Sequence, residues 1–163
     1  MALLGNDEYR IRFADRVQQH FFNGGALTTE AVTARWMKRA TEIDRAIVGE
    51  SARWGDTRIE PPRTRDVEWI AEQNRLLNEY FPQRPDILLQ QYRDAGLFST
   101  LAAPIYNQHG GVVSNGFELD FLNPNDEGTV YYTLDGSDPR SVGGNVAIDA
   151  NAFTAPTPLT FSV

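Results

Sequence analysis

The chain has 163 residues, no cysteine, a hydrophobic content of 41% and a formal net charge of −7. This composition supplies enough apolar residues for a packed core, and it excludes disulfides and thiolate metal sites. No apolar run approaches the roughly 20 residues of a membrane-spanning helix, and the N-terminus lacks the basic and apolar regions of a signal peptide. Residues 99–163 hold seven acidic residues against one arginine, so this part is not expected to bind nucleic acid.

Two helices are predicted at residues 6–22 and 28–50. Asn6 and Thr28 are suitable N-caps, and Gly24 follows the end of the first helix, as glycine often does. The short connection between the two helices predicts an antiparallel hairpin. The apolar stripe of the first helix recurs every four positions, at Tyr9, Phe13, Val17 and Phe21.

Two further helices are predicted at residues 65–81 and 85–95, after a polar loop. Thr64 is the expected N-cap of the third helix. Pro82 is its expected end, because proline disfavours a helical residue before it. Pro85 suits the first position of the fourth helix, where its missing N–H costs nothing.

From about residue 104 the pattern changes from helical to alternating. Apolar and polar residues alternate over residues 117–122, and β-branched or aromatic residues fill residues 130–134. The second of these strands ends in the turn-forming string DGSDP, and residues 159–163 resemble the beginning of another strand. Short strands at this spacing are typical of an immunoglobulin-like sandwich.

These patterns predict an α+β protein with two segregated regions. Residues 1–98 form a helical region of about four helices. Residues 99–163 form an incomplete immunoglobulin-like antiparallel β-sandwich.

The β region resembles the chitobiase/β-hexosaminidase C-terminal domain, an immunoglobulin-like module of many secreted carbohydrate-active and surface proteins. The resemblance rests on Ala103-Pro104, on Gly110-Gly111-Val112-Val113 and above all on the string YYTLDGSDPR at 131–140. It implies an extracellular or cell-surface parent protein and a glycan as a candidate ligand. The family continues with further strands after a segment like 154–159, so the resemblance implies a truncated module. An unpaired sheet edge in such a module is expected to favour self-association.

The helical region resembles the C-terminal part of the CotH kinase family, the atypical kinases related to spore coat protein H. In that family the nucleotide- and metal-binding acidic residues lie upstream of this helical tail, and no position here matches them. The resemblance implies one partner, the upstream kinase-like domain of the same parent chain. The matching residues are NDEYRIRFADR at 6–16, Ile43, Arg53-Trp54, Trp69 and Arg84-Pro85-Asp86. Side chains expected to be exposed without that partner are Phe13, Phe21, Trp36 and Trp69.

No catalytic, cofactor-binding or metal-binding residue is predicted, and no cofactor is expected. His20 and His109 lack the spacing of zinc ligands. Asp135, Ser137 and Asp138 fit a turn better than a calcium loop, which needs about five oxygen-donor positions.

Three aromatic residues are candidates for facing a ligand: Trp54, Tyr106 and Tyr131. For Trp54 a position in the core is the favoured interpretation, and an exposed sugar-stacking platform is the alternative. Only one of the neighbours Tyr131 and Tyr132 can face outward, because side chains alternate along a strand.

The favoured hypothesis is a non-catalytic C-terminal fragment of a larger secreted or surface CotH-like protein, acting as a structural or interaction module. On this hypothesis the chain alone is not an enzyme, although its parent belongs to the CotH-like atypical kinases. The first alternative is a part of such a kinase whose ATP site lies upstream. The second alternative is a weak carbohydrate-binding module, which rests on family association alone.

Overall fold

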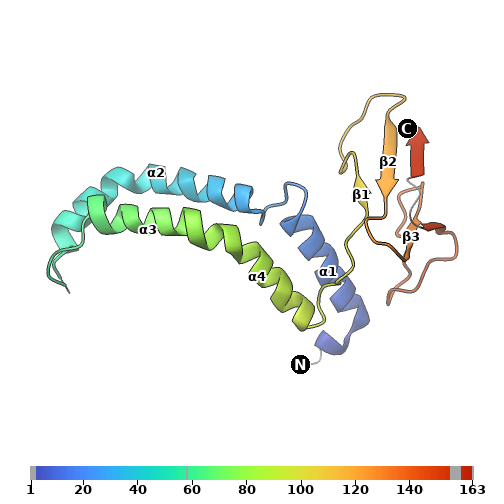
Figure 1. The fold of residues 1–163 in the computed structure, drawn as a ribbon, viewed down its shortest axis with the longest axis horizontal. Helices are drawn as coiled ribbons and strands as arrows, with labels where there is room; N and C mark the ends of the chain where they lie inside the picture. The colour runs from blue at the N-terminus through green and yellow to red at the C-terminus, as the bar shows by residue number, and fades with distance from the viewer. Residues whose placement is uncertain (1–2, 58, 155–158, 163) are drawn as a thin grey trace. The chain divides into compact units, whose positions relative to one another are not determined.

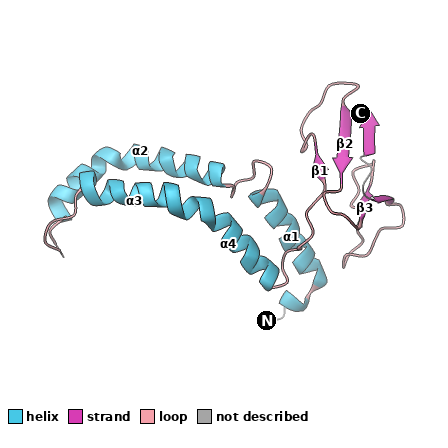
Figure 2. Ribbon diagram, viewed as in Figure 1, coloured by secondary structure: helices cyan, strands magenta, loops and turns pink. Residues whose placement is uncertain are grey.

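The computed structural model describes residues 3–57, 59–154 and 159–162, with helices before residue 95 and strands after residue 104 (Figure 1, Figure 2). Residues 1–18 and 92–163 form one compact unit, and residues 19–91 form another. The combination of helices with small antiparallel sheets agrees with the predicted α+β class. The arrangement of the helices differs from the prediction.

Helix α1 (Asp7–Phe21) follows a short 3₁₀ turn at Leu3–Gly5 and begins as the sequence predicts. The side chain of Asn6 accepts a hydrogen bond of 3.0 Å from the backbone N–H of Tyr9, which satisfies one of the free donors of the first turn. On the apolar stripe of this helix Val17 and Phe21 are buried, and Phe13 packs edge-on against Tyr92 with ring centroids 5.1 Å apart. The four-residue spacing therefore does mark the packed face of α1.

Helix α2 (Thr29–Trp54) has the predicted N-cap but ends later than predicted. The hydroxyl of Thr28 accepts from the N–H of Ala31 at 3.4 Å. The prediction that this helix ends at residue 50 is wrong, because residues 51–54 include no glycine or proline and the helix continues to Trp54. Gly55 caps the helix, and no side chain fits there, since a Cβ would lie 2.4 Å from the carbonyl oxygen of Arg63.

The predicted third and fourth helices are one continuous helical run. It comprises a π-helical segment at Arg65–Trp69, α3 (Ile70–Arg75), a second π segment at Leu76–Tyr80 and α4 (Phe81–Asp94). The run begins at the predicted cap, where Thr64 accepts from the N–H of Val67 at 3.2 Å. The prediction of a break at Pro82 is therefore wrong.

Two features let the helix continue through its prolines. The π segment before α4 shifts the hydrogen-bond register, so that the N–H of Phe81 bonds the carbonyl of Leu76, and Pro82 falls at the start of a new register. Pro85 lacks the N–H that would bond the carbonyl of Phe81. The hydroxyl of Thr29 on the neighbouring helix donates to that carbonyl instead, at 3.4 Å.

Helices α2 and α3 lie side by side in Figure 1 and are joined by polar and aromatic contacts. The indole N–H of Trp36 donates to the side-chain oxygen of Gln73 at 2.7 Å, and its ring meets Phe81 at 5.7 Å. Helix α2 and the helical run 65–94 form a hairpin, and nearer its tip the guanidinium of Arg65 donates to both carboxylate oxygens of Asp44 at 2.7 and 2.8 Å. These contacts define the register of the hairpin.

The aromatic side chains that were expected to be exposed are not exposed. Phe21 is buried, and Phe13, Trp36 and Trp69 are half-buried. The reason is that the chain supplies their packing partners itself, as the contacts of Phe13 with Tyr92 and of Trp36 with Phe81 show.

The strands form two antiparallel sheets within the described residues. One has the order β1-β2-β5, and the other pairs β3 with β4. Their bounds are Ile105–Tyr106, Glu118–Leu122, Thr129–Tyr132, Asn151–Thr154 and Leu159–Ser162, for β1 to β5 in turn. The predicted strands around 117–122 and 130–134 are confirmed as β2 and β3.

An aromatic cluster joins the inward faces of the two sheets. Phe121 of β2 contacts Tyr106 at 4.7 Å, Phe161 at 5.4 Å and Tyr132 of the other sheet at 6.1 Å. Val130, which is buried, lies on the same side of β3 as Tyr132. The alternation in the sequence therefore does select the face on which the sheets pack.

Candidate functional site

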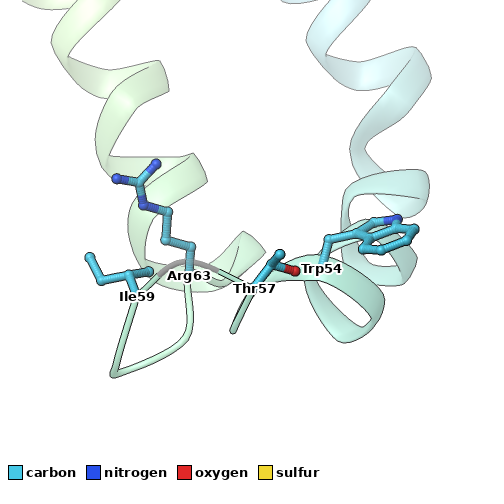
Figure 3. A pocket seen from close by; sticks show the side chains of 5 residues that line it. Trp54, Thr57, Ile59 and Arg63 are labelled. Carbon is cyan, nitrogen blue, oxygen red and sulfur yellow. The ribbon is translucent and has the colours of Figure 1, made fainter.

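The loop that follows Trp54, at the tip of the helical hairpin, borders a hollow in the 19–91 unit. The loop closes on itself, because the N–H of Gly55 bonds the carbonyl of Ser51 at 2.9 Å and the N–H of Arg63 bonds the carbonyl of Gly55 at 3.0 Å. The hollow has a volume of about 440 Å³. Its lining residues are Trp54, Gly55, Thr57, Ile59 and Arg63 (Figure 3).

Trp54 is the most prominent side chain of this site. It is 53% exposed, so the favoured interpretation of a core position is wrong. In Figure 3 its indole extends away from Ile59 and Arg63, and the guanidinium of Arg53 lies 4.8 Å from the ring centroid. The cation–π contact with Arg53 orients the ring without covering it fully. Trp54 is not in the core because it lies at the end of α2, beyond the point at which the facing helical run begins and could cover it.

The described side chains of this hollow offer both a ring and polar groups. An exposed indole can stack on a flat or sugar-like ring, and the hydroxyl of Thr57 and the guanidinium of Arg63 can donate hydrogen bonds elsewhere in the lining. The lining carries no carboxylate, imidazole or thiol among the described residues.

The other two candidate aromatics belong to the β region, in a different compact unit from Trp54. Tyr131 is 43% exposed on the outward face of β3, while its neighbour Tyr132 faces the aromatic cluster, as alternation predicts. Tyr106 is half-buried between Phe121 and His109, and burial raises the pKa of its phenol. Tyr131 and Tyr106 therefore do not form one platform.

The DGSDP string forms a turn held by its own side chains. The carboxylate of Asp135 accepts from the N–H and the hydroxyl of Ser137 at 3.0 and 2.6 Å, and these hydrogen bonds lower its pKa. The carboxylate of Asp138 accepts from the N–H of Arg140 at 2.9 Å. Within the described residues no group of three or more His, Cys, Asp or Glu side chains is placed to hold a metal ion.

Neither histidine has a partner of catalytic type among the described contacts. His20 is half-buried on α1, and its backbone carbonyl accepts from the N–H of Leu27 at 2.7 Å. His109 is exposed in the loop after β1, and its ring packs edge-on against Tyr106 at 5.6 Å.

Two features were missed by the sequence reasoning. The first is an apolar hollow of about 130 Å³ at the base of the hairpin, lined among others by Phe21, Val32, Phe81 and Leu88. The periodicity of these residues indicates a packed face, yet it cannot show that the packing leaves a gap. The second is a set of contacts between α1 and the loop after β3, which no local pattern in the sequence signals.

Comparisons of the chain with protein-family models, with curated proteins and with solved structures found no match. None of the helices in the described part of the chain is both long and apolar enough to cross a membrane.

Proposed function

We propose that this chain is a non-catalytic structural and interaction module of a secreted or cell-surface protein of the CotH type. One observation carries the proposal. All 26 residues of α2 lie in the described part of the chain, and none of them is buried, although the helix is amphipathic.

An amphipathic helix normally buries its apolar stripe against neighbouring elements. In α2 the packing supplied by α3 leaves large apolar side chains in contact with water, among them Met37 at 44% and Val48 at 56% exposure. Such a surface is characteristic of a segment that a further protein surface covers. On the CotH resemblance, the covering partner is the kinase-like domain of the parent chain.

The β region supports the same proposal. Leu134, Val142 and Ile148 are all strongly exposed. We assign the β region to an incomplete immunoglobulin-like sandwich. The support is that it has two antiparallel sheets that meet in an aromatic cluster, as the two sheets of such a sandwich do. Among the described strands, β1 and β5 lie at the two edges of their sheet, and such edges offer a route to self-association.

Nucleotide binding tests whether the chain has catalytic capacity of its own. Purified chain titrated with ATP and Mg²⁺ in a calorimeter is expected to give no binding heat. Binding or hydrolysis of ATP by residues 1–163 alone would refute the non-catalytic proposal and favour the alternative, in which these helices contribute to a kinase active site.

Binding to a CotH-type kinase-like domain tests the interaction role. Met37→Asp and Val48→Asp place a charge on the exposed apolar face and are expected to abolish binding, because an unpaired charge in an interface is strongly unfavourable. Ala46→Asp adds the same charge at an exposed position on the opposite side of α2 and serves as the control. Equal effects of all three substitutions would contradict the proposal, as would the absence of any binding by the unmodified chain.

A second candidate function, weak carbohydrate binding, is favoured by the exposed indole of Trp54, which lines the same hollow as Thr57 and Arg63. A glycan array at high protein concentration tests it. Signal that is lost in Trp54→Ala but kept in Tyr131→Ala would assign the site to the hairpin tip, and the converse would assign it to β3. An array without any signal would end this candidate.

A further inference from the structure

One face of α1 is in contact with the loop that follows β3. Glu8, Ile11 and Asp15 are spaced three and four residues apart, so they share this face. The carboxylate of Asp15 accepts two hydrogen bonds from the guanidinium of Arg140, at 3.0 and 2.8 Å, across 125 positions of the sequence. The carboxylate of Glu8 accepts from the backbone N–H of Gly143 at 3.1 Å.

Between these two polar contacts the surfaces meet closely. A Cβ built on Gly144 would lie 2.5 Å from the terminal methyl of Ile11. A Cβ built on Gly143, which has a similar positive φ, would meet nothing within 4 Å. Gly144 is therefore the point at which the loop approaches α1, and a side chain there has to displace Ile11.

The loop has its own internal framework. Arg140 and Val146 form an isolated antiparallel bridge. The N–H of Ser141 bonds the carbonyl of Asn145 at 2.8 Å, and the N–H of Ala147 bonds the carbonyl of Pro139 at 2.9 Å. These two hydrogen bonds make the bridge, and neither involves α1, so the loop can keep its shape when it separates from α1.

The contacts that hold α1 to the loop are of the weak kind. The side chains of Arg140 and Asp15 are 38% and 50% exposed, and ion pairs at this exposure contribute little and are screened by salt. Arg140 also bonds the carboxylate of Asp138, so its charge is shared between two acidic groups. Residues 99–163 contain no other basic residue that could take its place.

We propose that residues 139–147 form a detachable clip that fastens α1 to the β region. When the clip is closed, α1 and the β region move as one body. When it opens, the loop separates from α1 as a preformed piece, and α1 is free to change its direction relative to the sheets. This inference does not depend on the proposed function.

Amide hydrogen exchange, followed residue by residue by NMR on the full chain, distinguishes the clip from ordinary loop melting. Raising NaCl to about 1 M, where the Debye length falls to about 3 Å, is expected to speed exchange at Gly143. Exchange at Ala147 should not change, because its N–H bonds the carbonyl of Pro139 within the loop. Arg140→Gln at low salt should have the same effect. If the two amides accelerate together, or if neither responds, the inference is overturned.

A steric pair of variants tests the same contact without changing any charge. Gly144→Leu should open the clip, whereas Gly143→Leu, with comparable backbone strain but open space, should leave it closed. Adding Ile11→Ala to Gly144→Leu should restore slow exchange at position 143, because it frees the space that leucine needs. Equal opening by both leucine variants, or failure of Ile11→Ala to restore protection, would mean that the close approach of Gly144 to α1 does not decide whether the clip closes, and would overturn the inference.

Discussion

Removing the side chain of Phe81 is the most severe test of how the helical hairpin is held together. Phe81 is only 9% exposed, and its ring meets Trp36 at 5.7 Å and Tyr80 at 5.6 Å. It also lines the apolar hollow at the base of the hairpin. Phe81→Ala should therefore enlarge an existing gap rather than let the surrounding side chains close over it.

The expected loss follows from the burial. Truncation of a buried phenylalanine to alanine costs about 3–5 kcal/mol, and the cost is greatest where the site cannot collapse. With a hollow of about 130 Å³ already adjacent, we expect a value of about 4 kcal/mol. Because domains of this size are stable by about 5–15 kcal/mol, such a loss removes a large share of the total stability and is readily measured.

Urea unfolding followed by far-UV circular dichroism measures this loss. Ile87→Ala is the matched control, since Ile87 lies on the same helix, is 44% exposed and is not among the residues that line the hollow. We expect about 1 kcal/mol for the control, in the usual range for a partly exposed side chain. A loss below about 1 kcal/mol for Phe81→Ala, or equal losses for the two variants, would refute the view that this ring holds the hairpin together.

Three further outcomes are expected. Thr29→Val should lower the free energy of unfolding by about 1 kcal/mol, because the carbonyl of Phe81 loses its donor. In a Pro85→Ala background the loss should be smaller, because the N–H of Ala at position 85 can bond that carbonyl. Equal losses in the two backgrounds, measured by thermal unfolding, would contradict the role of this hydrogen bond. The N–H of Thr64 holds the pKa of Glu68 below its ordinary value of 4.5, so the stabilisation from this cap is complete above that value and is lost as the pH falls through the folded-state pKa. A pH titration of stability should accordingly be flatter below pH 4.5 for Glu68→Gln than for the unmodified chain, and identical curves would contradict the assignment. Trp54→Ala should change stability by less than about 0.5 kcal/mol, because the indole is more than half exposed, and a larger loss would show that it packs in the core.

Local signals gave the helix starts and two of the strands. Asn6, Thr28 and Thr64 each accept a backbone hydrogen bond within three residues, so the sequence contains both partners of each cap. The alternation around Phe121 likewise depends on strand geometry alone. These predictions succeed because the interacting groups are close in the chain.

For the candidate site, the sequence predicts which aromatic residues matter but not which of them are exposed. The sequence selects Trp54 as an aromatic residue of interest, but its exposure depends on where α2 ends and on which residues pack around it. Tyr131 is outward-facing as a candidate should be, whereas Tyr106 is drawn into the aromatic cluster by Phe121, a contact between different strands. Burial is a property of the folded chain, so residue type alone does not decide it.

The sequence by itself determined the α+β class, the N-caps at Asn6, Thr28 and Thr64 and the face on which the sheets pack. Tertiary structure decided that α4 continues through its prolines, because Thr29, from a different helix, supplies the donor that Pro85 lacks. It also decided that α1 is fastened to the β region, through Asp15 and Arg140. Both features depend on polar partners far apart in the chain, and only the folded backbone brings such groups within hydrogen-bond distance.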